Sequence, residues 1–368
     1  MPANPSAADR PFVSVVVPVY NDPDGIRATL DSLVDQTYPE TASEVIVVDN
    51  DSTDETPAVA RSVAADHPGL VRLVRETEIQ SSYAARNAGV RAASGDVIAF
   101  VDADVVADAD WLEAGVEAMG ERGAEYLGCR VDVPCPEPTF AGRYNAATGF
   151  PVRRYVEEGS FAPTCALFVA RAVFADVGTF DGGLVSGGDV EFGRRVAASG
   201  RKIHYAPEAR VEHPARTSLR SLLEKYVRVG GGAVQQRRRY PDRFDPRPLY
   251  DPVLYLPPHP LRFHRNFGAE WDRLRRTEKL GLYAVGALVK FAETGGRLAE
   301  RFGVGSAPAE GIDRLGPAAT GGRAERVAEF DPAADAQLAG ESAGAEPTTE
   351  FESMTDAERA ANATEPSD

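Results

Sequence analysis

The first hundred residues alternate between β-branched apolar runs and segments whose apolar residues recur at helical spacing. Phe12–Tyr20 is an almost continuous apolar run, as expected for a strand buried on both faces. Asp22 and Pro23 then serve as an N-cap and a first-turn proline, so the sequence predicts a helix from there through about Thr37. The further predicted elements are the strand 44–49, a helix starting at 52–54, the strand 71–75, the helix 81–93 and the strand 96–101.

This alternation of strands and helices over short links predicts an α/β fold. Its sheet is expected to be mostly parallel, with helices on both faces. Because ligands bind outside the carboxyl ends of strands in such sheets, residues that end the strands are the first candidates for a functional site.

Charge divides the chain into three parts. The net charge is −12 over residues 1–234, +6 over residues 235–303 and −10 over residues 304–368. We therefore expect one catalytic-sized domain, a basic helical extension and an acidic tail. The tail is predicted to be disordered, because its large apolar side chains are too few to offset the entropy of the chain.

The amino-acid composition argues against some classes of protein and favours others. A net charge of −16 argues against nucleic-acid binding, which needs a positive surface. The excess of acids and the dominance of Arg over Lys resemble the proteomes of salt-loving archaea; a GC-rich genome that favours Arg codons is the alternative. The three cysteines form neither a disulfide framework nor a zinc set, and neither a signal peptide nor a membrane-spanning run is recognisable. We expect a cytoplasmic protein.

Acidic residues end two of the predicted strands. Asp49 ends the strand 44–49, and Asp102 follows the strand 96–101. Asp102 and Asp104 are two residues apart, so their carboxylates lie on the same side of an extended segment. Hard oxygen ligands of this kind suit Mg²⁺ or Mn²⁺. On the spacing alone, a solvated acidic turn is the simpler explanation.

Four sequence blocks change that assessment because they occur together and in order. They are Val13–Asn21, Val45–Asp54, Ala84–Asp104 and Val177–Arg195. The sequence here resembles the family-2 glycosyltransferases, which have the Rossmann-like GT-A fold. The resemblance implies an inverting enzyme that transfers a sugar from a nucleoside-diphosphate sugar to a hydroxyl. It also implies a Mn²⁺ or Mg²⁺ cofactor on Asp102 and Asp104, with Asp102 contacting substrate as well.

The resemblance implies further substrate-binding residues. Pro18 and Tyr20 would lie beside the nucleotide base, and Asp49 would accept a hydrogen bond from it. Arg86 and Asn87 would border the nucleotide, where an Arg can balance diphosphate charge. The alternatives are a structural capping role for Asp49 and, for Arg86, a surface helix position paired with an acid.

The catalytic base implied by the resemblance is Asp189, which follows a glycine-rich loop. A base must reach the acceptor hydroxyl whose proton it removes. Where the family usually has a Glu-Asp pair, this chain has Gly188 and Asp189, so Glu191 is the candidate for the second carboxylate. His213 would complete the metal site. The alternatives are a helix N-cap for Asp189 and a structural loop histidine for His213.

The sequence disfavours two rival functions. A nucleotidyltransferase would carry a basic, Gly-rich triphosphate loop after the first strand, but no cation follows that strand before Arg27. A non-catalytic sugar-nucleotide-binding scaffold would not need to keep all four of the aspartates Asp49, Asp102, Asp104 and Asp189. Gln236–Tyr240 partly matches the Q-x-x-R-W element of processive synthases; with Tyr in place of Trp, we interpret it as a basic helix end and predict no processive synthesis.

The basic extension contains an apolar helix, Leu280–Phe291, preceded by several Arg. Its apolar stripe is predicted to be Leu280, Tyr283, Ala287 and Phe291. Such a helix is typical of peripheral contact with the inner face of the cell membrane; packing on the domain or at a dimer interface is the alternative. Membrane contact would favour a polyprenyl- or dolichyl-linked acceptor and a step in surface-glycoprotein glycan assembly.

Overall fold

The computed structural model describes residues 10–244, 251–268 and 270–304. Its centre is an eight-stranded sheet with the order β3-β2-β1-β4-β7-β6-β8-β5. The strands are β1 (Val13–Val19), β2 (Ser43–Asp49), β3 (Val71–Arg75), β4 (Val97–Val101), β5 (Val106–Ala107), β6 (Tyr126–Asp132), β7 (Ala166–Ala170) and β8 (Ile203–Glu212).

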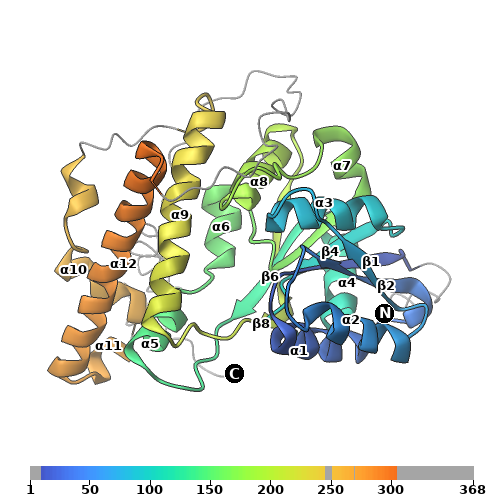
Figure 1. Cartoon of the computed structure of the whole chain (residues 1–368), viewed down its shortest axis with the longest axis horizontal. Coiled ribbons are helices and arrows are strands. Elements are labelled where there is room, and N and C mark those ends of the chain that lie inside the picture. The colour runs from blue at the N-terminus through green and yellow to red at the C-terminus, as the bar shows by residue number, and fades with distance from the viewer. Residues whose placement is uncertain (1–9, 245–250, 269, 305–368) are drawn as a thin grey trace, which may run out of the picture.

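The first half of the sheet is parallel, as predicted. β1 pairs in parallel with β2 and β4, and β2 pairs in parallel with β3. All residues of β1, β2 and β4 are buried, because helices cover both faces. Figure 1 shows α1 (Pro23–Val34) and α2 (Thr56–Asp66) on one side of these strands and α3 (Ser82–Ala92) on the other.

The second half of the sheet is mixed. β7 is antiparallel to both of its neighbours, β4 and β6, and β5 is antiparallel to β8, whereas β6 and β8 are parallel. The α/β fold is therefore confirmed, while the parallel pattern of the first hundred residues does not extend to the later strands. The helices around this half are α4 (Trp111–Arg122), α5 (Phe140–Thr148), α6 (Val152–Gly159), α7 (Arg171–Val177) and α8 (Gly188–Ala198).

Hydrogen bonds at the helix ends explain why one predicted helix start agrees with the structure and another does not. The Asp22 carboxylate accepts a hydrogen bond from the Gly25 amide at 2.9 Å, so the expected N-cap of α1 is confirmed. α2 begins at Thr56 rather than at residues 52–54. Asp51 has a positive φ, and the Asp54 carboxylate accepts from the Thr56 amide, so residues 51–54 form a turn instead of a first helical turn.

Two long helices, α9 (Leu219–Arg239) and α12 (Arg276–Phe302), run side by side next to the sheet domain (Figure 1). Residue 234, the predicted end of the catalytic domain, falls inside α9. The remaining short helices are η2 (Glu40–Ala42), η3 (Pro252–Tyr255), α10 (Pro260–Phe263), η4 (His264–Phe267) and α11 (Glu270–Arg273). Almost all of the predicted acidic tail, residues 305–368, lies outside the described residues.

α12 packs on the domain through one face and leaves another apolar face exposed. Leu282, Val285 and Val289 are buried in a cluster with side chains of α5 and α9, so packing on the domain, the alternative left open above, is what the structure shows. Tyr283 donates a hydrogen bond to the Pro258 carbonyl and does not belong to the outer face.

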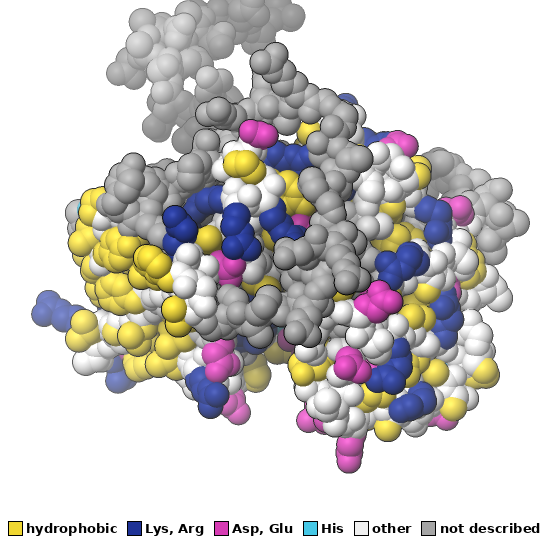
Figure 2. All heavy atoms as spheres, turned by 45° about the horizontal axis from the view of Figure 1, so that its top comes forward, with side chains coloured by type: hydrophobic (Ala, Val, Ile, Leu, Met, Phe, Trp, Pro, Cys, Tyr) yellow, Lys and Arg dark blue, Asp and Glu magenta, His cyan; other side chains and the backbone are white. Residues whose placement is uncertain are grey.

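The outward stripe follows a helical repeat and consists of Leu280, Leu288, Phe291 and Phe302, between 44% and 72% exposed. Figure 2 shows hydrophobic side chains gathered over this part of the molecule, with Lys and Arg beside them. None of the helices in the described ranges combines the length and hydrophobicity that a membrane span requires.

Candidate active site

A cavity of about 470 Å³ opens at the carboxyl ends of β1 and β4, between the start of α8 and the side of α9. Its position matches the edge at which parallel sheets bind ligands. Seven of the predicted site residues line it: Pro18, Tyr20, Arg86, Asp102, Asp104, Asp189 and His213. The other three, Asp49, Asn87 and Glu191, do not.

Asp102, Asp104 and His213 form a three-residue cluster in which one ligand atom of each lies within 4.8 Å of the others. Asp102 and Asp104 follow β4, and His213 follows β8, so two separate strands bring the cluster together. The Thr29 hydroxyl fixes the turn by donating to the Val105 carbonyl at 2.7 Å.

The histidine of this cluster has spare ligating capacity. His213 is buried, its Nδ1 has no hydrogen-bond partner among the described residues, and its Nε2 lies 3.8 Å from Asp104 Oδ1, beyond hydrogen-bond distance. The Phe150 ring stacks on it at 5.1 Å. Two carboxylates and one imidazole are a donor set that fits Mn²⁺ and accommodates Mg²⁺.

Arg86 is tied to the same cluster. Its guanidinium donates to Asp102 Oδ1 at 2.5 Å, although only 4% of the side chain is exposed, and it lies over the Tyr83 ring. The alternative of an acid-paired Arg is therefore right about the partner and wrong about the surface location. A buried cation at the cavity wall is available to an anionic ligand once that carboxylate turns to another partner.

Asp189 lies in the first turn of α8 and faces the cavity. The N-cap of this helix is Gly187, whose φ of +80° suits glycine, so Asp189 is not the capping residue. Its Oδ1 accepts from the Val190 amide at 3.0 Å and from the Tyr83 hydroxyl at 3.4 Å. Burial raises the pKa of the Asp189 carboxyl above its ordinary value, and Asp102 adds to this, while Arg86 and the amide oppose it. A carboxylate with a raised pKa accepts a proton more readily.

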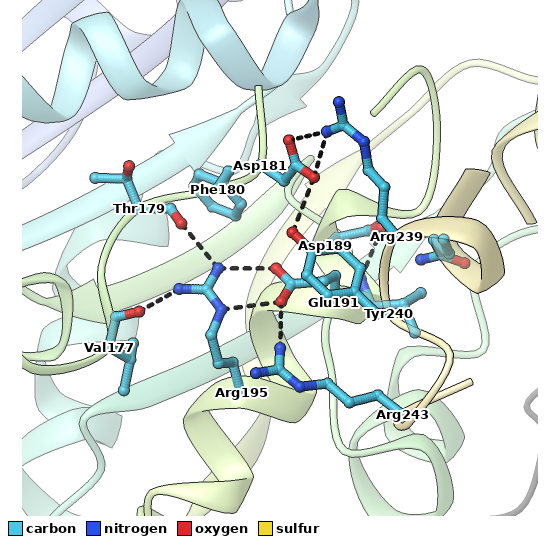
Figure 3. A network of polar contacts seen from close by, with 12 residues as sticks. Val177, Thr179, Phe180, Asp181, Asp189, Glu191, Arg195, Arg239, Tyr240 and Arg243 are labelled. Carbon is cyan, nitrogen blue, oxygen red and sulfur yellow. Dashed lines mark hydrogen bonds and ion pairs between the residues drawn. The ribbon is translucent and has the colours of Figure 1, made fainter. Parts of the chain in front are cut away.

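Glu191 lies outside the cavity and is fully buried in an ion-pair network (Figure 3). Arg195 donates to both carboxylate oxygens, and Arg243 donates to one of them at 2.7 Å. The same Arg195 also donates to the carbonyls of Val177 and Thr179. Through Arg195, Glu191 thus links α8 to the segment that leads into the glycine-rich loop. Both of its carboxylate oxygens already accept hydrogen bonds from arginines.

Asp49 and Asn87 are also buried and bonded to protein groups. The Asp49 carboxylate accepts from the Ser52 amide at 3.0 Å and from Arg75 at 3.3 Å. The Asn87 side-chain amide makes two hydrogen bonds with the backbone of Phe180, one in each direction. Asn87 thereby holds the start of the segment 180–187, whose last residues line the cavity, whereas the loop that Asp49 holds contributes no residue to the cavity lining.

Sequence reasoning missed the wall of the cavity that α9 supplies. Gln236, the first residue of the Q-x-x-R-like element, donates to the Gly187 carbonyl at 2.5 Å next to Asp189. Arg216, Lys225 and Arg228 line the same cavity. The Q-x-x-R spacing was the only sequence signal for this wall, and it was interpreted as a basic helix end.

Comparison with known proteins shows that this chain is similar to glycosyltransferases. The model of glycosyl transferase family 2 matches residues 14–176. Glycosyltransferase AglE of Haloferax volcanii is 35% identical over 294 residues, which cover 78% of this chain and 95% of that protein. Pre-mycofactocin glycosyltransferase of Mycobacterium tuberculosis is 28% identical over 253 residues, covering 67% of this chain and 52% of that protein.

One solved structure shares the fold. It is the mannosyltransferase PcManGT from Pyrobaculum calidifontis in complex with GDP-Man and Mn²⁺, with a TM-score of 0.50 and 22% identity. The match covers 92% of this chain and 87% of that one. The similarity therefore extends over the helical region as well as the sheet domain.

Proposed function

The chain belongs to glycosyl transferase family 2, and from that premise we propose an inverting, metal-dependent transfer of a sugar from a nucleoside-diphosphate sugar to a hydroxyl. One observation carries the proposal: Asp102, Asp104, His213 and Asp189 line a single cavity at the carboxyl edge of the sheet. The fold shared with a GDP-Man- and Mn²⁺-bound mannosyltransferase supports the choice of donor and metal.

Asp102, Asp104 and His213 would hold Mn²⁺ or Mg²⁺. When bound there, a divalent cation supplies positive charge that stabilises the leaving diphosphate. Pro18 and Tyr20, which line the cavity, would lie beside the nucleotide base, and Arg86 would add a fixed positive charge for the diphosphate. Asn87 would act on the donor by positioning a segment that lines the cavity, since neither its own side chain nor that of Asp49 lines it.

Asp189 is the proposed general base. It takes the proton of the acceptor hydroxyl as that oxygen bonds to the anomeric carbon, while the bond from this carbon to the diphosphate oxygen breaks. The electron pair of the broken bond leaves with the nucleoside diphosphate. The Tyr83 hydroxyl orients the carboxylate, and Glu191 positions α8 rather than contacting the substrate.

We also propose that the exposed stripe of α12 contacts an anionic membrane surface and that the acceptor is lipid-linked, such as a polyprenyl- or dolichyl-phosphate carrier. Leu280, Leu288 and Phe291 would enter the interface, and the exposed Arg273, Arg275 and Arg276 would approach lipid phosphates. With such a contact, the enzyme would act at the inner face of the cell membrane, in surface-glycan assembly.

A panel of UDP- and GDP-sugars tests the transfer. With Mn²⁺ or Mg²⁺ in concentrated salt, we expect release of the nucleoside diphosphate from at least one donor, and loss of that release in Asp189→Asn. Asp110→Asn, which changes an exposed acid outside the cavity, is the matched control. Equal release by wild type and Asp189→Asn would refute the assignment of the base.

Vesicle flotation tests the membrane contact separately. Wild type should float with vesicles containing anionic lipid and less with neutral ones, and a triple change of Leu280, Leu288 and Phe291 to Ser should abolish flotation. If the triple variant floats as well as wild type, α12 is not the contact; if neither binds and sedimentation instead shows a dimer, the stripe is a subunit interface.

A further inference from the structure

The cavity is also lined by a group of three cations, Arg216, Lys225 and Arg228. Lys225 and Arg228 come from α9, and Arg216 follows β8. Residues 225 and 228 are three apart on a helix, so they share one of its faces. Three positive charges thus line the same cavity as the candidate metal ligands, and they come from elements other than the strand end that carries the two aspartates.

The part of the chain that the structure describes does not neutralise these cations. Within the described ranges, no carboxylate lies within ion-pair distance of Arg216, Lys225 or Arg228. Among the other arginines that line the cavity, Arg86 is paired with Asp102 and Arg297 with Glu293. In a chain of net charge −16, carboxylates are abundant, so three neighbouring cations without one indicate a place for an anion from outside.

Lys225 shows that the arrangement has an electrostatic cost. Its Nζ lies 5.2 Å from the centre of the Phe150 ring and 5.7 Å from that of Tyr226. Burial in these surroundings, together with repulsion by Arg216 and Arg228, lowers the pKa of Lys225 to about 8. An anion bound among the three cations would relieve that repulsion.

The location of the group distinguishes it from the donor site. The donor diphosphate has its own partners, the metal cluster and Arg86. Phe150 contacts both the His213 ring and Lys225, so a single aromatic side chain separates this group of cations from the candidate metal ligands. An anion bound to this group would therefore lie close to the reacting sugar without replacing the donor phosphates.

We propose that Arg216, Lys225 and Arg228 bind a phosphate or diphosphate group of the acceptor. The inference rests on the proposed transfer reaction and specifies its acceptor as a phosphate-bearing alcohol, whose hydroxyl reacts while these three side chains hold its phosphate. Charge-assisted contacts from Arg and Lys are the usual means of holding such a group. The phosphate can belong to an isoprenoid lipid or to a water-soluble sugar, and the two sources are separable by experiment.

The test compares wild type with a Lys225→Gln/Arg228→Gln double variant. Arg238→Gln is the matched control, because Arg238 is exposed on the same helix and does not line the cavity. Binding by calorimetry would use two probe pairs at fixed ionic strength: citronellyl phosphate against citronellol, and glucose 6-phosphate against glucose. Donor binding would be measured with GDP and UDP in the presence of Mn²⁺.

We expect a phosphorylated probe to bind wild type and the Arg238 control, its unphosphorylated partner to bind neither, and the double variant to bind about tenfold to hundredfold more weakly. The single substitution Lys225→Arg, which keeps the positive charge, should retain most of the wild-type binding. The loss in the double variant would then be due to the missing charge rather than to a folding defect. Tighter binding of citronellyl phosphate would identify a lipid source, and of glucose 6-phosphate a soluble one.

Equal binding of the phosphorylated probes to wild type and double variant, or no binding to wild type, would overturn the inference. An equal loss of nucleoside-diphosphate binding in the double variant would also overturn it, because the cations would then bind the diphosphate of the donor. Neither result affects the proposed function, which fails instead if wild type binds no nucleoside diphosphate and releases none from any nucleotide sugar.

Discussion

The close contact between α9 and α12 predicts that replacing glycine by alanine on these helices will lower the stability of the protein at one position and raise it at another. A Cβ added at Gly230 would lie 2.0 Å from the Glu293 carbonyl oxygen, and one added at Gly296 would lie 2.0 Å from the Val227 carbonyl oxygen. Both obstacles are backbone atoms of the neighbouring helix, so rotation of a side chain cannot relieve them. At Gly295, which points outward, an added Cβ meets nothing within 4 Å.

The magnitude follows from two opposing terms. Real Cβ contacts are essentially never shorter than 3.0 Å, so Gly230→Ala forces the helices apart by about 1 Å. Overpacking of this kind costs up to about 3 kcal/mol, and Ala returns about 1 kcal/mol of helix propensity, which leaves a loss of about 2 kcal/mol. Gly295→Ala keeps the propensity term alone, a gain of about 1 kcal/mol.

The assay is urea unfolding followed by circular dichroism at fixed salt, with the midpoint compared at constant slope. The two variants should move the midpoint in opposite directions. Gly230→Ala should also slow release of nucleoside diphosphate, because α9 carries Gln236 and Lys225 into the cavity. Stabilisation by both substitutions would refute the close packing of α9 on α12.

Three further predictions concern the acids and the pH. Asp189→Asn should lower transfer by about 10²- to 10⁴-fold. Because burial raises the pKa of Asp189 in the folded protein, ionisation of this carboxyl lowers the free energy of unfolding as the pH rises through that pKa. The neutral amide avoids this cost, so Asp189→Asn should keep or raise the unfolding midpoint at neutral pH. The acidic limb of the pH–rate profile should lie above the range of an ordinary Asp, since transfer needs the ionised base and rises with pH through its raised pKa. Glu191→Gln should lower the free energy of unfolding by about 3–5 kcal/mol, because Arg195 and Arg243 lose their carboxylate partner.

The parts of the fold that could be predicted are those that local sequence determines. β1, β2 and β4 are continuous apolar runs, and α1 carries its own cap, so each was located within about three residues. The antiparallel placement of β7 between β4 and β6 depends on pairings between distant segments, which no local pattern records.

The candidate site likewise contains residues that the local sequence predicts and residues whose place depends on contacts between distant segments. Asp102 and Asp104 were predictable because they follow β4, a strand that local sequence locates, whereas Asp189 lies in the first turn of α8 and was identified by the motif alone. Glu191 was expected near the substrate, but Arg243, 52 residues further along the chain, occupies its carboxylate. The cations of α9 were missed since only the packing of that helix turns them into the cavity.

Mn²⁺ binding followed by electron paramagnetic resonance tests the central claim most directly, because it needs no knowledge of the sugar or the acceptor. In the presence of GDP or UDP, wild type and Asp189→Asn should each bind one ion, whereas Asp104→Asn and His213→Gln should weaken binding by about tenfold or more. Undiminished binding in both of the last two variants would contradict the metal-dependent mechanism.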